Sequence, residues 1–176
     1  MTLMDHNLEA LQALFAQWGE PKYRAAQVYS WLNRGVRPEH MTNLPKSLRD
    51  KLAHLPFGGV TIHTKLTSAK DGTIKYLFAL EDGNLVEGVL MSYRHGNTLC
   101  LSTQVGCAMG CTFCASTLTG CVRDLTAGEM MAQVAAAESD APPPPGRDRS
   151  VPNIVLMGSG EPLLNYDNVV AFLRRV

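Results

Sequence analysis

Apolar residues recur at helical spacing through the first part of the chain. The first set is Leu8, Leu11, Leu14, Phe15 and Trp18. This spacing is typical of an amphipathic helix, and Gly19 can end it. The same reasoning predicts a second helix over about residues 22–33, and a third that begins near Pro45 and stops before Pro56. We therefore predict a small helical domain over residues 1–58.

From residue 60 the helical spacing gives way to short apolar runs. The first run alternates apolar and polar residues, and turn signals (Asp71-Gly72 and Asp82-Gly83) separate it from two others. Such dipeptides favour tight turns between antiparallel strands. The pattern predicts three short strands in hairpins, forming a connector over residues 59–95. The runs are 60–66, 74–80 and 85–91.

The last part of the chain alternates strand and helix signals. Residues 99–101 predict a short strand, and Thr126 with Glu129 has the spacing of a capping box before a helix. Residues 153–157 form a continuous apolar run, which is typical of a buried parallel strand, and a second helix starts near Tyr166. This alternation predicts an α/β fold, the first part of a parallel βα barrel.

Two strand–helix units neither close a barrel nor cover a parallel sheet. We therefore expect residues 96–176 to be an incomplete catalytic domain and the chain to be an N-terminal fragment. The proline-rich residues 141–146 predict a loop.

The composition of the chain excludes few classes of function. No apolar run approaches the ~20 residues that span a membrane, and no secretory signal begins the chain, so a cytoplasmic protein is expected. The 16 basic residues balance the 16 acidic ones. Between Lys22 and Lys51, however, there are seven basic residues and only two acidic ones. This excess fits either phosphate binding or an ordinary solvated helix face.

All five cysteines fall within 22 residues. Cys107, Cys111 and Cys114 have the spacing C-x3-C-x2-C, and three thiolates on one loop can hold three irons of a [4Fe–4S] cluster. The fourth iron then stays open for S-adenosylmethionine (SAM). The alternative is structural zinc, with Cys100, Cys121 or His95 as a further ligand. Zinc is less favoured because its structural sites need four ligands, usually in two close pairs.

A second candidate binding segment follows the predicted strand at 153–157. It reads Gly158-Ser159-Gly160-Glu161-Pro162. Glycines at the carboxyl end of a buried strand let the backbone approach a ligand closely. Backbone acceptors and Glu161 are therefore candidates for binding the ammonium group of SAM.

Together these segments resemble the radical SAM superfamily, and closely the RlmN/Cfr group of adenine methyltransferases. The resemblance covers nearly the whole chain. The segments that carry it are Gly19 to Gln27, Trp31-Leu32, Met41 to Pro45, Leu99 to Cys114, Arg123 to Glu129 and Gly158 to Asn165. The cysteine motif specifies the superfamily, whereas the Cys100-to-Cys107 segment and the N-terminal signature specify the group.

The resemblance implies methylation at C2 of an adenine in 23S rRNA and of the adenine 3′ of the anticodon in some tRNAs. It implies a [4Fe–4S] cluster on Cys107, Cys111 and Cys114, with SAM bound at Gly160 and Glu161. A methyl-carrying cysteine delivers the carbon to the base. Glu87 removes the C2 proton, and Cys100 resolves the protein–RNA crosslink and leaves a disulfide. Without the resemblance, Glu87 is an ordinary strand carboxylate and Cys100 a small buried side chain.

The resemblance also implies partners and leaves alternatives open. Expected partners are 23S rRNA, tRNA and a flavodoxin-like reducing system, with a monomeric protein. The alternatives are methylation at adenine C8, as in Cfr, and a zinc-stabilised RNA-binding module. Cys121 is interpreted as packing, and Ser159 stands where the family commonly has Met. No residue matches the methyl-carrying cysteine, so we expect this chain alone not to methylate RNA.

Overall fold

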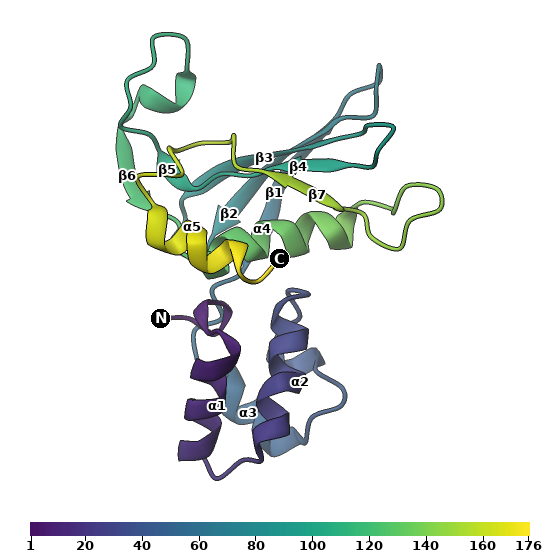
Figure 1. Ribbon diagram of the computed structural model, residues 1–176, viewed down its shortest axis with the longest axis vertical. Helices are drawn as coiled ribbons and strands as arrows, with labels where there is room; N and C mark the ends of the chain where they lie inside the picture. Colours follow the sequence, from purple (N-terminus) through teal and green to yellow (C-terminus); the bar gives the residue numbers. More distant parts are fainter.

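Three helices form the N-terminal part of the protein, which lies below the sheet in Figure 1. The computed structural model describes residues 1–176. The helices are α1 (Leu8–Gln17), α2 (Lys22–Leu32) and α3 (Lys46–Ala53), with short 3-10 turns η1 (Leu3–Asp5) and η2 (Pro38–His40). All three helices were predicted. Gly19 and Gly35 follow α1 and α2 with φ angles of +69° and +68°, which glycine adopts without strain.

The apolar positions that predicted these helices are buried or packed, partly buried, against the core. Leu11 and Phe15 of α1 pack with Val28 and Leu32 of α2, and all four are inaccessible to solvent. They belong to one cluster of 31 buried residues that continues into the sheet and the helix beside it. The helices and the sheet are therefore packed on a continuous hydrophobic core.

The turn η1 joins the helices to the rest of the protein. The Leu3 amide donates to the Pro56 carbonyl over 2.8 Å, which holds η1 against the end of the helical part. On its other side, the Asp5 carboxylate accepts a hydrogen bond from the Gly128 amide over 3.3 Å. Gly128 has no room for a side chain, because a Cβ there would lie 2.6 Å from the Met4 backbone.

A five-stranded sheet forms the second part of the protein. Its strands are β1 (Val60–Thr67), β2 (Ile74–Leu80), β3 (Leu85–Met91), β4 (Thr98–Cys100) and β7 (Asn153–Val155), in the order β1-β2-β3-β4-β7. The pairings β1–β2 and β2–β3 are antiparallel, as the hairpin signals predicted. Strand β3 also pairs antiparallel with β4, and β4 pairs in parallel with β7. The predicted connector strands thus share one sheet with the two strands that precede the candidate binding loops.

Helices α4 (Ala127–Asp140) and α5 (Tyr166–Leu173) lie on one side of this sheet (Figure 1). The predicted capping box at the start of α4 is confirmed. The Glu129 amide donates to the Thr126 hydroxyl over 3.1 Å, and the Thr126 amide donates to the Glu129 carboxylate over 3.0 Å. No helix in the structure is both long and apolar enough to cross a membrane. The observed class is mixed α/β, as predicted.

Two features differ from the prediction. Strand β7 is half-buried rather than buried, because it lies at the edge of the sheet with β4 as its only strand neighbour. A separate two-stranded ribbon, β5 (Gln104–Gly106) and β6 (Cys121–Asp124), was not predicted. Each of these strands is too short for apolar periodicity to be visible. The ribbon brackets the cysteine motif and includes the turn η3 (Ala115–Thr117) between its strands.

A polar cluster ties the end of α4 to the edge of the sheet. The Asp140 carboxylate accepts hydrogen bonds from Lys65 Nζ over 2.7 Å and from the Tyr76 hydroxyl over 2.8 Å. Tyr76 is fully buried, and its burial together with the Asp140 charge raises the pKa of the phenol well above its ordinary value. The Lys65 contact holds the pKa of the Asp140 carboxyl below its ordinary value.

We expect Tyr76→Phe to lower the free energy of unfolding by about 1 kcal/mol near neutral pH, because one hydrogen bond to Asp140 is lost. The phenol pKa is higher in the folded than in the unfolded chain. Its contribution is therefore complete below about pH 10 and declines as the pH rises above that value. Urea denaturation at about pH 7 and about pH 10.5 measures both effects. An equal difference between variant and wild type at the two pH values would contradict this account.

Candidate functional site

The cysteine motif lies on a loop that projects from the β5–β6 ribbon. Cys107 follows β5 directly, and its amide donates to the Gly120 carbonyl over 3.1 Å, which closes the base of the loop. The loop and its short turn η3 rise away from both the sheet and the helices in Figure 1. Gly106 fits this base only as glycine, because a Cβ there would lie 2.0 Å from the Gly120 carbonyl oxygen. The ribbon therefore presents the cysteines beyond the carboxyl end of β4.

The three cysteines differ in burial. Cys107 is buried at the base of the loop, Cys114 is partly buried, and Cys111 is exposed. All five cysteines of the chain are free thiols. No three His, Cys, Asp or Glu side chains converge closely enough to hold a single metal ion. A [4Fe–4S] cluster instead offers a separate iron to each thiolate, and three free thiols on one open loop suit that chemistry.

Arg123 on β6 anchors the ribbon to the body of the protein. Its Nη1 and Nη2 atoms donate to the two carboxylate oxygens of Glu129 over 2.8 and 2.7 Å, and its Nε donates to Asp82 over 2.7 Å. A bidentate arginine–carboxylate pair fixes orientation as well as distance. These contacts raise the pKa of Arg123, so its charge is permanent. The base of the cysteine loop is thus tied to α4 and to the β2–β3 turn.

The glycine segment after β7 forms a turn beside the end of β4. The Gly158 amide donates to the Leu101 carbonyl over 3.0 Å, and the Ser159 amide donates to the Ser102 hydroxyl over 2.9 Å. A Cβ on Gly158 would lie 2.6 Å from the Leu101 carbonyl oxygen, so the close approach requires glycine. We refer to residues 158–161 as the glycine turn. The structure thus places the predicted SAM-binding segment at the carboxyl ends of two parallel strands.

Gly160 and Glu161 are the two residues of the glycine turn that the sequence predicted to bind SAM. Gly160 has a φ angle of +105°, and it packs against Gln104. The Glu161 carboxylate accepts a hydrogen bond from the Leu163 amide over 3.0 Å, which orders the end of the turn. Both residues are partly exposed, so their polar groups are accessible to a ligand.

Glu87 and Cys100 lie on the same face of the sheet. Val89 of β3 is directly opposite Cys100 of β4, and Glu87 is two residues from Val89 on its strand. Residues two apart in a strand share a face, as do directly opposite residues. The buried neighbours Val86 and Leu90 point to the other face, toward the hydrophobic core. The structure thus brings both predicted catalytic residues to the open face of the sheet.

The surroundings of Glu87 and Cys100 differ. The Glu87 carboxylate is 2.7 Å from Lys75 Nζ, and both side chains are about half exposed. Burial raises the pKa of the Cys100 thiol above its ordinary value. A hydrogen bond from the Met157 backbone acts in the opposite direction but is the smaller effect. Cys121 lies outside the motif on β6, and burial raises its thiol pKa as well.

Several residues that build this site were not singled out from the sequence. Gln104, Ser102 and Asn165 are buried polar residues that hold the glycine turn and the strand ends together. Asn165 Nδ2 donates to the carbonyls of Thr103 and Leu125 over 2.8 and 2.7 Å. The hydrogen-bond partners of these residues lie 20 or more residues away in the sequence. The only sign of their role in the sequence was therefore their position next to the cysteine and glycine motifs.

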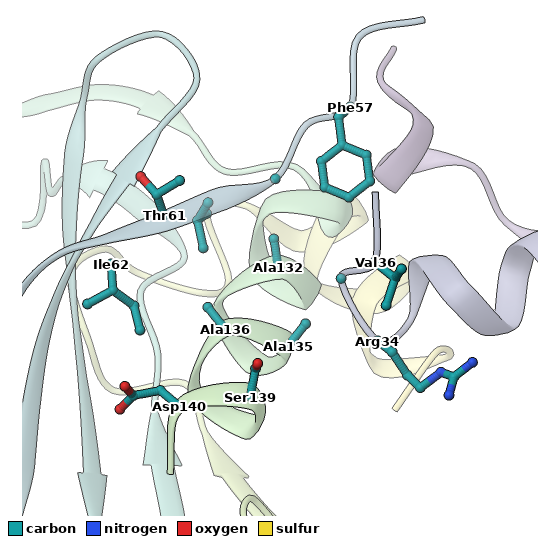
Figure 2. A pocket seen from close by; sticks show the side chains of 13 residues that line it. Arg34, Val36, Phe57, Thr61, Ile62, Ala132, Ala135, Ala136, Ser139 and Asp140 are labelled. Atoms are coloured by element: carbon teal, nitrogen blue, oxygen red, sulfur yellow. The ribbon is translucent and has the colours of Figure 1, made fainter. Parts of the chain in front are cut away.

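A cavity of about 550 Å³ lies elsewhere, between β1, α4 and the loop that follows α2 (Figure 2). Its wall consists mainly of small and apolar side chains such as Ala132, Ala136 and Ile62. The charged residues on its wall are Arg34 and Asp140, and Asp140 is already bonded to Lys65 and Tyr76. None of the predicted site residues lines it, so this cavity is separate from the candidate site.

Comparison with known proteins agrees with this arrangement. Residues 1–56 match the family model described as the ribosomal RNA large subunit methyltransferase N-terminal domain. A protein of Alkaliphilus oremlandii, named probable dual-specificity RNA methyltransferase RlmN, is 51% identical over 98% of this chain and 49% of its own length. A protein of the same name from Alkaliphilus metalliredigens is 48% identical over 99% of this chain and 48% of its own length.

The chain is a homologue of the RlmN methyltransferases. A crystal structure of a radical SAM methyltransferase from Sphaerobacter thermophilus has the same fold, with a TM-score of 0.88 and 44% identity over 99% of this chain and 51% of that one. The resemblance to the RlmN group is therefore confirmed, and the zinc-stabilised module is not favoured. The chain spans about half the length of the RlmN relatives that it matches.

Proposed function

We propose that this chain supplies the cluster-binding and SAM-binding part of a radical SAM methyltransferase that modifies C2 of adenine in 23S rRNA and in tRNA. One observation supports this most strongly. The cysteine loop follows β4 by way of the short strand β5, and the glycine turn follows β7, the parallel neighbour of β4. Two segments far apart in the sequence therefore meet beyond the carboxyl ends of these two strands. In α/β folds, ligands bind at the carboxyl ends of such strands.

Cys107, Cys111 and Cys114 would hold the [4Fe–4S] cluster, and Gly160 and Glu161 would hold SAM beside it. When bound, the two cofactors supply the radical chemistry that an electron-poor ring carbon requires. The exposed position of Cys111 and the open loop around it leave room for a cluster. The glycine turn offers backbone groups and a carboxylate to the amino acid portion of SAM.

Glu87 and Cys100 would act on the RNA adduct from the open face of the sheet. The Glu87 carboxylate accepts the C2 proton of adenine, and its contact with Lys75 over 2.7 Å holds the carboxylate in place on this face. The Cys100 sulfur attacks the sulfur of the methyl-carrying cysteine. The Cys100 thiol loses its proton as the disulfide forms, and the bond between the other sulfur and the transferred carbon breaks. That carbon keeps the bonding electron pair and takes up a proton, which makes it the methyl group of the RNA product. The disulfide must be reduced before the next turnover, and a flavodoxin-like reducing system is the expected electron donor of the enzyme.

The proposed domain division is a helical RNA-binding domain over residues 1–58, β-hairpins over 59–95 and the first part of a radical SAM βα barrel over 96–176. Exposed cations accompany aromatic side chains on the helical part, as where Arg34 lies 4.1 Å from the centre of the Trp31 ring. Such pairs suit binding of phosphates and unpaired bases. We propose a monomeric, cytoplasmic enzyme that binds its RNA partly through this surface.

The test is a chimera in which this chain replaces the matching half of the Alkaliphilus oremlandii RlmN. The chimera and the 176-residue chain are each loaded with iron and sulfide and incubated with SAM, a reductant and a 23S rRNA fragment. Mass spectrometry of the nucleosides should detect 2-methyladenosine with the chimera and no product with the chain alone. 8-Methyladenosine would support the Cfr-like alternative. A folded, cluster-loaded chimera without methylated adenine would contradict the proposed function.

A further inference from the structure

The two binding segments of the candidate site are joined by one buried side chain. Gln104 lies at the start of β5, directly before the cysteine loop, and only 3% of its surface is exposed. Its Oε1 atom accepts a hydrogen bond from the Glu161 amide over 2.9 Å. Its Nε2 atom donates to the Asp124 carboxylate over 2.7 Å. One amide therefore bonds the glycine turn on one side and β6 on the other.

The backbone around Gln104 strengthens the same junction. The Ser159 carbonyl accepts hydrogen bonds from the Thr103 amide over 2.8 Å and from the Gln104 amide over 3.1 Å. The missing side chain of Gly160 leaves space for the Gln104 side chain, because a Cβ on Gly160 would lie 2.6 Å from Gln104 Cβ. Gln104 is thus seated against the turn that it binds, and its side chain is not free to take another position.

A second contact links the same two segments farther out. The hydroxyl oxygens of Ser116 and Ser159 are 3.1 Å apart, so the turn η3 just after Cys114 touches the glycine turn. The cysteine loop is therefore connected to the glycine turn near its base through Gln104 and Asp124, and near its far end through the serine pair.

We infer that Gln104 is a positioning residue that couples the glycine turn to the cysteine loop, and so sets the alignment of SAM with the open iron of the cluster. This inference rests on the proposed function. A primary amide suits this role because it offers a donor and an acceptor on one planar group. A carboxylate at position 104 would keep the acceptor for Glu161 but would lose the donor, and it would face the Asp124 carboxylate.

The pair can be exchanged, which gives a sharp test. Gln104→Glu places two acceptors against each other, whereas the double variant Gln104→Glu with Asp124→Asn restores a donor and an acceptor with the direction reversed. Asp124→Asn alone keeps an acceptor for Gln104. Tyr76→Phe serves as the control, because it removes the buried hydrogen bond to Asp140, which involves neither the glycine turn nor the cysteine loop.

The first measurement is hydrogen exchange at the Glu161 amide in the cofactor-free chain. Exchange should accelerate about tenfold in Gln104→Glu, because repulsion from the Asp124 carboxylate displaces the side chain that accepts the Glu161 amide, and it should return to near the wild-type rate in the double variant. Tyr76→Phe should leave it unchanged. Unaltered exchange in Gln104→Glu would overturn the inference.

The second measurement is SAM affinity of the cluster-loaded chain, by equilibrium dialysis with iron content determined in parallel. Affinity should fall about tenfold in Gln104→Glu at unchanged iron content and recover in the double variant. Wild-type affinity in folded Gln104→Glu, or no recovery in the double variant, would overturn the coupling. If the cluster-loaded wild-type chain binds no SAM, the proposed function and the role in SAM alignment both fail, while the exchange measurement still decides whether Gln104 holds the turn.

Discussion

Replacement of Cys111 by alanine is expected to abolish binding of the [4Fe–4S] cluster while leaving the fold intact. Cys111 is exposed on the loop between β5 and β6 and forms no side-chain hydrogen bond within the protein, so its loss removes a cluster ligand and little packing. Iron and sulfide content after anaerobic loading should fall from about four of each per chain to near zero. The free energy of unfolding of the cofactor-free chain should change by less than about 0.5 kcal/mol.

Cys121→Ala is the matched control for this prediction. Cys121 lies on β6 outside the motif, so its variant should load iron as the wild type does. Equal iron content in the Cys111→Ala variant and the wild-type protein would contradict the assignment of Cys111 as a cluster ligand. Loss of iron in the Cys121 variant alone would instead identify Cys121 as the ligand.

Gly160→Ala is expected to have the second large effect. The variant would hold alanine at a φ angle of +105°, and its Cβ would lie 2.6–2.8 Å from the Cβ, Cγ and backbone nitrogen of Gln104. These atoms belong to the backbone or lie close to it, so they can move aside only if the backbone shifts. Backbone strain and overpacking together should lower the free energy of unfolding by about 3 kcal/mol. Urea denaturation of the cofactor-free chain measures the loss.

Gly72→Ala separates the two causes. Gly72 has a φ angle of +72°, but no atom lies within 4 Å of a Cβ built on it. Its variant should therefore lose only about 1 kcal/mol, from backbone strain alone. Equal losses at both positions would show that the contact between Gly160 and Gln104 contributes nothing. That result would also remove one support for the role of Gln104.

Much of the fold is predictable because long helices and strands repeat apolar residues at a regular spacing that is visible in the sequence. The stripe of Leu11, Phe15 and their neighbours identified α1, and the capping box at Thr126 and Glu129 identified the start of α4. The hairpin strands were identified by Asp-Gly turns. The parallel pairing of β4 with β7 followed from the alternation of strand and helix. The three-residue strand β5 shows no period, so the ribbon at the base of the cysteine loop was missed.

The candidate site was predictable only in part, for a related reason. Cysteine spacing and the Gly-x-Gly-Glu sequence are local patterns, so the sequence identified both segments. The contacts that align them are between residues distant in sequence, such as Gln104 with Glu161 and Arg123 with Asp82. A glutamine or arginine in a short loop gives no local sign of such a partner. The ion pair of Glu87 with Lys75 likewise depends on strand register rather than on sequence spacing.

The most direct measurement is the EPR spectrum of the reduced, cluster-loaded chain with and without SAM. The account predicts a [4Fe–4S]⁺ signal whose shape changes when SAM is added, because three cysteines leave one iron open to a ligand. A folded chain that forms no cluster, or a cluster whose signal SAM leaves unchanged, would contradict it.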